Sequence, residues 1–370
     1  MDKKQKALLI VNPCSGRNKS RAGTFEIVDK FSNSDFDFSV HTTTCQGDAT
    51  NIVKRELGEH DLVVCCGGDG TLNETINGVM DMPRRVPIGY IPAGTTNDIA
   101  NSLGIPTDIK DATELIINGK PNDYDIGLFN NRYYSYVASF GAFSKSSYTT
   151  SQKLKNRFGR LAYIAAGVAE VKDIRNIKMR VEYDEGIIEG KFVFGTVSNS
   201  LSVGGFIKLP EDAVKFNDGK FEVILVKDFK PHKLLSLMHK TITQKYDNKE
   251  IIMFSTNKIK FTALEEDVPW TIDGEYGGSH REVRINVLER AVELYSPETE
   301  HFLPKPAVIE PVEEEEPKEG RKSRISKRVK GDKKSARAKQ DDDSLQSVNG
   351  EEKAADVTDS AANNSETVTC

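Results

Sequence analysis

The stretch LVVCCGGDGT, Leu62–Thr71, joins a short apolar run to three glycines that surround one aspartate. The apolar run Leu62–Cys66 predicts a buried strand, since continuous apolar residues are typical of strands covered on both faces. Glycines allow the chain to turn sharply and bring backbone N–H groups against an anion. The next residues predict a helix, because Thr71 and Glu74 have the spacing of a capping box. Strand, glycine turn and helix together predict a phosphate-binding site.

Length and composition indicate a folded protein without a nucleic-acid partner. The 370 residues are enough for two domains, and 37% are hydrophobic. The net charge of −5 gives no sign of nucleic-acid binding. The five cysteines form no C-x-x-C pair or Cys/His cluster, so zinc is not expected and the thiols are expected to be reduced. No signal peptide or run of membrane-spanning length is found. We therefore expect a cytoplasmic protein that contacts a membrane only peripherally.

The first part of the chain, from Lys6 to about Ile126, alternates short apolar runs with amphipathic stretches. This alternation is typical of βα units around a mostly parallel sheet. Asp48 and Asp111 stand where helix N-caps are expected. The predicted strands are Ala7–Asn12, Phe36–Thr42, Leu62–Cys66 and Ile88–Ile91, and the predicted helices are Ser20–Phe31, Asp48–Leu57, Thr71–Met80, Thr95–Leu103 and Asp111–Ile117.

The second part, from Asn130 to about Pro297, alternates strand-like runs with turn signals. The clearest turns are Tyr183–Ile187 and Phe216–Phe221, which we interpret as hairpins. Two helices are expected near residues 151–172 and 231–246. The predicted domains cover residues 1–128, 129–300 and 301–370, and the last strands of the second could pack back on the first. The last segment has charge runs and few apolar residues, so it is expected to be disordered. Its basic block could bind anionic lipid headgroups or simply keep the chain soluble.

Two further loops resemble the opening motif. Asn12–Lys19 follows the first predicted strand, where Ser15 and Gly16 could donate backbone hydrogen bonds to phosphate, although an ordinary βα loop would also fit. Pro92–Asp98 follows the strand Ile88–Ile91 and again places a glycine before threonines. Loops after neighbouring parallel strands lie on the same sheet edge, where ligands bind. Ordinary helix caps would account for the Thr/acid pairs of these loops, but not for the glycines that precede Asp69.

A third site lies far along the sequence, in the segment Trp270–Gly278. Its Asp273-Gly274-Glu275 could be an ordinary hairpin turn. Two carboxylates beside a glycine could also serve phosphoryl transfer, one near a metal and one as proton acceptor. The residues alone leave both alternatives open.

These motifs, in this order, resemble those of the diacylglycerol kinase catalytic-domain family, and most closely its soluble bacterial lipid kinases. The resemblance spans about residues 5 to 297 and rests on the segments Asn12–Gly16, Gly67–Glu74, Gly94–Asp98, Asn217–Gly219 and Asp273–Glu275. The glycine-aspartate motif alone is shared with NAD kinases and phosphofructokinases. The resemblance implies an α/β plus β fold: a mostly parallel α/β ATP-binding domain, then a β-sandwich-like lipid-binding domain and the disordered charged tail.

The resemblance also implies roles for individual residues. Glu275 corresponds to the proton acceptor, Asp273 supports it, and Asp69 lies beside the phosphates and a catalytic Mg²⁺. Thr43, Gly68–Glu74 and Thr95 correspond to ATP-contacting positions. The candidate nucleotide-binding residues are Asn12, Ser15, Gly16, Thr43, Gly67, Gly68, Asp69, Gly70, Thr71, Leu72, Asn73, Glu74, Gly94, Thr95, Asn97 and Asp98.

A second, structural Mg²⁺ is implied at the turn near Asn217. Asp218 would supply its carboxylate, and Lys215 and Lys220 would supply backbone carbonyls, although the turn needs no metal to form. Lys155 resembles a basic position of the substrate cleft, and it could equally be a solvated helix lysine.

The resulting hypothesis is an ATP-dependent lipid kinase that transfers the γ-phosphate directly to a lipid hydroxyl, with diacylglycerol as the expected acceptor and phosphatidic acid as product. One alternative is a kinase for a soluble substrate, similar to NAD kinase. Another is a lipid- or nucleotide-binding regulator that has lost catalysis. The sequence leaves the lipid and the oligomeric state open, although an exposed sheet edge could form a homodimer.

Overall fold

The structure is a computed structural model that describes residues 4–141, 176–203, 207–210, 213–228 and 250–304. All of them belong to one compact unit, Met1–Lys305. The helices expected near residues 151–172 and 231–246, Lys155 and the charged tail lie outside the described residues. In the described part of the chain, no helix has the length and apolar composition of a membrane-spanning segment.

The first part is an α/β layer around four parallel strands, in the order β4-β3-β1-β2. The strands are β1 (Gln5–Val11), β2 (Phe36–Thr42), β3 (Leu62–Gly67) and β4 (Ile88–Pro92). The helices are α1 (Lys19–Ser32), α2 (Asp48–Glu56), α3 (Asp69–Met80), α4 (Asp98–Leu103) and α5 (Ile109–Asn118), with 3₁₀ turns at Ser15–Asn18 and Leu57–Glu59.

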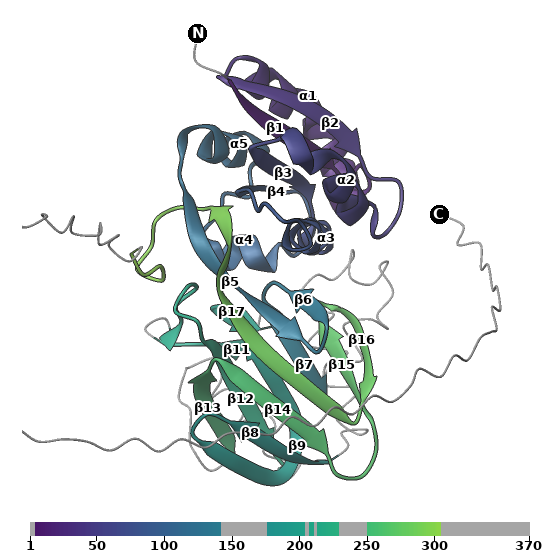
Figure 1. Cartoon of the computed structure of the whole chain (residues 1–370), viewed down its shortest axis with the longest axis vertical. Coiled ribbons are helices and arrows are strands. Elements are labelled where there is room, and N and C mark those ends of the chain that lie inside the picture. The colour runs from purple at the N-terminus through teal and green to yellow at the C-terminus, as the bar shows by residue number, and fades with distance from the viewer. Residues whose placement is uncertain (1–3, 142–175, 204–206, 211–212, 229–249, 305–370) are drawn as a thin grey trace, which may run out of the picture. The chain divides into compact units, whose positions relative to one another are not determined.

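The apolar side chains of these strands point alternately into two cores. Leu9 and Val64 belong to a core with Ile27 of α1 and Ile116 of α5. Their neighbours along the strands, including Val63, join the core that contains residues of α2, α3 and α4. Helices therefore cover both faces of the parallel strands, as Figure 1 shows, which explains why the strands are apolar throughout.

The predicted start of α3 is wrong, and the acid predicted to cap α3 serves another helix instead. Helix α3 begins at Asp69 rather than Thr71. Glu74 forms no capping box with Thr71, and its carboxylate instead accepts hydrogen bonds from Gly47 N (2.8 Å) and Ala49 N (3.2 Å) at the start of α2. A carboxylate at a helix N-terminus satisfies free N–H groups and favours the helix dipole.

Helix α2 begins at Asp48 as predicted, but its N-cap and two further predicted helix starts are corrected. The N-cap of α2 is Gly47, with φ of 82°, rather than Asp48. The N-cap of α5 is Asp108 rather than Asp111, and its carboxylate accepts hydrogen bonds from two backbone N–H groups of the first turn. Helix α4 begins at Asp98, after Thr95.

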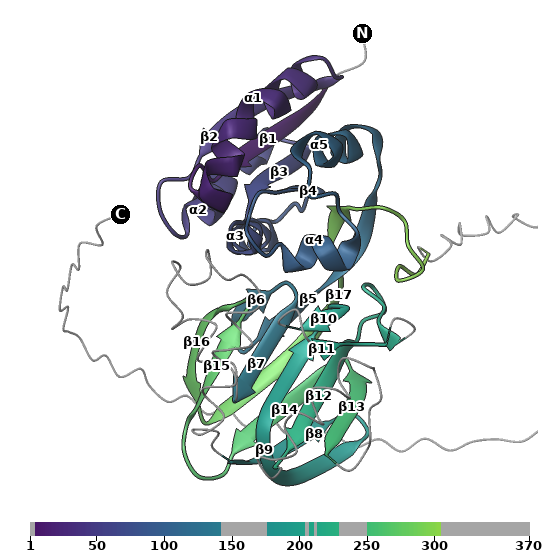
Figure 2. The same ribbon diagram turned by 180° about the vertical axis from the view of Figure 1, so that it is seen from behind.

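The second part is built from antiparallel strands that continue the same sheet, except for β10 and β11, which pair with each other in a separate two-stranded sheet. Its strands are β5 (Pro121–Phe129), β6 (Arg132–Tyr134), β7 (Val137–Gly141), β8 (Ile177–Tyr183), β9 (Gly186–Ser198), β10 (Ser202–Val203), β11 (Ile207–Lys208), β12 (Phe221–Lys227), β13 (Ile251–Thr256), β14 (Lys258–Ala263), β15 (Val268–Ile272), β16 (Glu275–His280) and β17 (Glu282–Tyr295). Strand β17 pairs with β14 and β5, and Leu294 at its end pairs in parallel with Ile88 of β4. Figure 2 shows β17 running between the two parts. The predicted fold class, α/β followed by a β-sandwich-like part, is confirmed.

An aromatic core holds this second part together. The Trp270 ring lies 4.8 Å from that of Phe140, 5.1 Å from Phe261 and 5.2 Å from Phe129, between ring centroids. Because Trp270 is in β15, this cluster fixes the strand that leads into Asp273.

One of the two predicted hairpins is confirmed. Tyr183 pairs with Gly186 across the turn between β8 and β9. The segment Phe216–Phe221 is a turn but not a hairpin, because β12 pairs with β9 and β13 instead. The Phe216 backbone bonds to His301 and Asp125, so segments distant in sequence hold this turn.

Candidate functional site

The two glycine turns meet at the carboxyl ends of β3 and β4. Ala93 N donates a hydrogen bond to Gly67 O at 2.7 Å. A Cβ on Gly94 would lie 2.7 Å from the Gly68 Cα, and a Cβ on Gly16, where φ is 55°, would clash with the Ala93 carbonyl. Only glycine allows these loops to approach so closely. The three predicted phosphate loops therefore form one surface of largely bare backbone.

Asp69 links the starts of two helices at this edge. It is the first residue of α3, and its carboxylate accepts hydrogen bonds from Asp98 N (3.2 Å) and Ile99 N (3.5 Å) of α4. Burial and the neighbouring Asp98 charge raise the pKa of Asp69 to about 7. A nearby cation would offset both effects and favour the carboxylate.

The surroundings of Asp69 fit a divalent metal carrying phosphates. Among the described residues, the buried Asn97 Oδ1 and Tyr90 hydroxyl have no hydrogen-bond partner. Burial raises the pKa of Tyr90, and the charges of Asp69 and Asp98 raise it further. The Tyr90 hydroxyl therefore lies close enough to both carboxylates to interact with them electrostatically. Carboxylates and neutral oxygens are the donors that Mg²⁺ prefers.

Other predicted nucleotide-binding residues are bonded within the protein. Thr71 Oγ1 accepts a hydrogen bond from Asn12 Nδ2 at 2.9 Å, which ties the first loop to α3. Thr43 is buried, and its N–H bonds to Val11 O. Leu72 is fully buried in the core. Thr95 is exposed, so its side chain is free of the core.

Asp273 is a buried hydrogen-bond acceptor between the two parts. It lies in the turn from β15 to β16, with φ of 46°. Its carboxylate accepts bonds from Asn73 Nδ2 (2.6 Å), the Ser135 N–H and hydroxyl (both 2.7 Å), Tyr136 N (3.1 Å) and Val137 N (3.0 Å). Burial raises the pKa of Asp273, and the bonds from residues 135–137 oppose this. With five donors around it, this carboxylate positions the turn.

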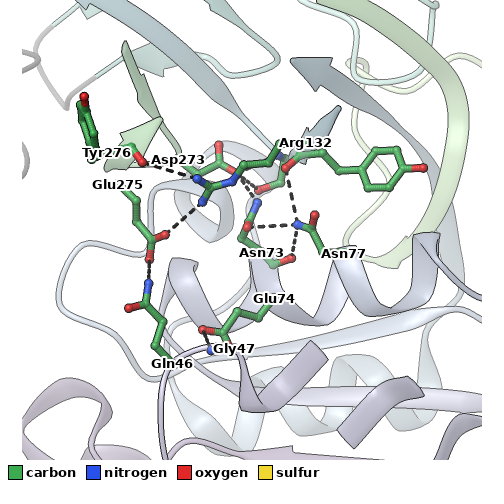
Figure 3. A network of polar contacts seen from close by, with 11 residues as sticks. Gln46, Gly47, Asn73, Glu74, Asn77, Arg132, Asp273, Glu275 and Tyr276 are labelled. Carbon is green, nitrogen blue, oxygen red and sulfur yellow. Dashed lines mark hydrogen bonds and ion pairs between the residues drawn. The ribbon is translucent and has the colours of Figure 1, made fainter. Parts of the chain in front are cut away.

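Glu275, two residues on, has a different environment. Its side chain is 43% exposed, and its Oε2 accepts a hydrogen bond from Arg132 Nη2 at 3.1 Å. Oε1 accepts one from Gln46 Nε2 at 3.3 Å, as Figure 3 shows. A Cβ on Gly70 would lie 3.7 Å from Oε1. The structure thus brings an accessible carboxylate against the opening glycine motif.

The contacts of Arg132 and Gln46 with Glu275 were not predicted from the sequence. Arg132 begins a strand of three residues, and Gln46 lies in the loop between β2 and α2. Arg132 belongs to no motif, and the sequence does not predict a contact between Gln46 and Glu275. Only the fold brings them to Glu275.

In the turn predicted to hold a structural metal, Lys215 and Asp218 bind different partners. Asp218 Oδ1 accepts a hydrogen bond from Lys220 N at 2.9 Å, and Lys215 Nζ donates to Glu300 O at 2.6 Å. Burial raises the pKa of Asp218. The buried Asp125 nearby accepts bonds from Gly219 N and Arg290 N. In the described ranges, no three His, Cys, Asp or Glu side chains are arranged to hold a metal.

The chain matches two family models. Residues 6–129 match the diacylglycerol kinase catalytic domain, and residues 138–296 match the YegS C-terminal NAD kinase beta sandwich-like domain. A diacylglycerol kinase of Bacillus subtilis (strain 168) is 35% identical over 277 residues, which cover 74% of this chain and 91% of that protein. One from Staphylococcus carnosus (strain TM300) is 34% identical over 295 residues, covering 80% and 96%.

Solved structures agree with these matches. The crystal structure of a diacylglycerol kinase from Bacillus anthracis str. Sterne gives a TM-score of 0.64 at 23% identity, covering 80% of this chain and 98% of that one. Another structure from the same organism gives 0.69 at 25% identity, covering 80% and 97%. The resemblance stated from the motifs is confirmed: this chain belongs to the diacylglycerol kinase family of lipid phosphotransferases.

Proposed function

We propose that this chain transfers the γ-phosphate of ATP to the hydroxyl of diacylglycerol and forms phosphatidic acid. The observation that carries the proposal is the Glu275 carboxylate beside Gly70. This carboxylate would be the proton acceptor, and the glycine turn beside it is suited to phosphate. Family membership supports a lipid kinase that uses ATP and a divalent metal.

The glycine loops would bind the nucleotide. The backbone N–H groups of the loops after β1, β3 and β4, and those at the start of α3, would donate hydrogen bonds to the phosphates. Asp69 would hold Mg²⁺, with Asn97 and Asp98 close by. The bound Mg²⁺ would neutralise charge on the phosphate oxygens.

Glu275 would act as the general base. Its carboxylate takes the proton of the lipid hydroxyl as the hydroxyl oxygen forms a bond to the γ-phosphorus, and the bond from that phosphorus to the bridging oxygen breaks to release ADP. Asp273 keeps the turn in place through its hydrogen bonds to residues 135–137. Asn73 connects this turn directly to α3.

Three further features belong to the proposal. The turn at Lys215, Asp218 and Lys220 would bind a structural Mg²⁺ through one carboxylate and two carbonyls. The enzyme would act in the cytoplasm at the membrane surface, where a diacylglycerol resides. A homodimer could form through β13, which among the described strands pairs only with β12. The boundaries 1–128, 129–300 and 301–370 remain our proposed division of the chain.

The proposal is tested by incubating the purified chain with Mg²⁺ and γ-labelled ATP, in separate reactions with a total lipid extract, diacylglycerol or NAD. Labelled phosphatidic acid is expected. Label in NAD, or in no lipid while ATP binds, would contradict the proposal. Glu275→Ala should abolish turnover and leave ATP binding largely intact, whereas loss of both would indicate a structural role for Glu275.

A further inference from the structure

Arg132 is the cation closest to the reacting carboxylate in the described structure. It begins β6, and its guanidinium donates from Nη2 to Glu275 Oε2 (3.1 Å) and from Nη1 to Tyr276 O (3.5 Å). Figure 3 shows the Arg132 side chain reaching across to the start of β16, with Gln46 on the opposite side of the carboxylate. Glu275 is therefore held from two sides by residues from different parts of the chain.

The fold does not need this ion pair to keep β6 in place. Tyr134, at the other end of the strand, is fully buried, and the adjoining Ser135 donates two hydrogen bonds to Asp273. Arg132 and Glu275 are 38% and 43% exposed, and exposed ion pairs contribute little to stability. The Arg132–Glu275 ion pair is therefore of interest for where it holds the carboxylate, rather than for its contribution to stability.

A free glutamate side chain has several rotamers, and few of them would direct its carboxylate at Gly70. A guanidinium with fixed, planar donors restricts them, which an ammonium does less well. The donation to the Tyr276 carbonyl anchors the guanidinium to the same strand that carries Glu275. The carboxylate is consequently oriented before a substrate arrives.

We propose that Arg132 is a positioning residue that holds the Glu275 carboxylate against the glycine turn for proton transfer. This inference rests on the proposed function of Glu275. Among the described residues, the hydrogen bonds of Arg132 go to Glu275 and Tyr276 and not to the phosphate loops. Loss of the guanidinium should therefore slow turnover without weakening ATP binding. A misplacement of the base by about 1 Å can lower the rate roughly a hundredfold.

The test compares the full-length wild-type chain with Arg132→Gln, Arg132→Lys and Arg180→Gln. Arg180 is a matched control on β8, because it is 39% exposed and forms ion pairs with Glu182 and Glu189. Turnover is measured with dioleoylglycerol in detergent micelles and Mg²⁺-ATP, ATP affinity by equilibrium binding, and folding by the melting temperature.

Arg132→Gln is expected to lower kcat by about tenfold to a hundredfold, with ATP affinity within about twofold and an unchanged melting temperature. Arg132→Lys should recover part of the lost kcat, and Arg180→Gln should match wild type. Wild-type kcat in Arg132→Gln, a loss confined to ATP affinity, or no recovery with lysine would overturn the inference. If wild type makes no labelled lipid, the proposed function itself fails. This outcome differs from the three above, in which wild type is active and only the role of Arg132 is overturned.

Discussion

Gly70 offers a direct way to test whether the glycine turn and Glu275 enclose the reacting atoms. It is the second residue of α3, and among the described residues outside this helix an added Cβ would have one neighbour within 4 Å, the Glu275 Oε1 at 3.7 Å. This distance is ordinary van der Waals contact, so Gly70→Ala requires no rearrangement of the protein. Alanine in place of glycine within a helix should stabilise the fold by about 0.5–1 kcal/mol.

The same methyl group should nevertheless block the reaction. A hydroxyl that gives its proton to Glu275 must lie about 2.6–3.2 Å from the carboxylate oxygen, in the space beside Gly70. A methyl group that displaces this hydroxyl by about 1 Å should lower kcat/KM roughly a hundredfold. Gly70→Ala is therefore expected to fold as well as wild type and to be almost inactive.

The assay measures label transfer to dioleoylglycerol and, in parallel, the melting temperature. Gly58→Ala is the control, because a Cβ there would meet nothing within 4 Å. Gly94→Ala is a contrast, because its Cβ would lie 2.7 Å from the Gly68 Cα and should also destabilise the fold. Full activity in a well-folded Gly70→Ala would refute the view that the carboxylate and the turn enclose the reacting atoms.

Three other predictions follow from the buried groups. Asp273→Asn should lower the free energy of unfolding by about 2–4 kcal/mol in urea titrations, because an amide cannot replace a carboxylate that accepts five hydrogen bonds. Burial and the Asp218 charge raise the pKa of Glu222 to about 9, so its contribution to stability is full below its ordinary pKa of about 4.5 and is lost as pH rises through 9. Within that window, the free energy of unfolding of wild type, measured in chelator, should fall by up to about 1.4 kcal/mol per pH unit more than that of Glu222→Gln, because groups such as Asp69 titrate in both proteins. Iodoacetamide at pH 8 should label the exposed Cys14 and spare the buried Cys66, whose pKa burial raises to about 12, as peptide mass spectrometry would show; equal labelling would contradict this.

The sequence predicted the elements of the α/β part well, because their apolar periodicity is local. It failed at the capping box of α3, because the capping carboxylates at the starts of α2 and α4 come from another element. Glu74 of α3 serves the start of α2, and Asp69 serves the start of α4. A pattern read within one helix assigns such an acid to its own helix, and hence the predicted capping box is wrong.

In the candidate site, too, the sequence did not predict contacts between segments that are distant along the chain. Short glycine motifs identified the three loops that meet at this sheet edge, since few other residues allow such close approach of backbones. No local signal marks Arg132, and none pairs Gln46 with Glu275, because Glu275 is distant along the chain from both residues. The Phe216–Phe221 turn was misread as a hairpin for a related reason: Asp125 and His301, from other segments, hold it.

The most direct test of the account is the transfer of labelled phosphate from Mg²⁺-ATP to diacylglycerol by wild type and by Glu275→Gln, with ATP binding measured on both. We expect labelled phosphatidic acid from wild type, at least about a hundredfold less from Glu275→Gln because a general base contributes about that much, and equal ATP binding by the two. Comparable turnover by Glu275→Gln, or no lipid product from an ATP-binding wild type, would contradict the account.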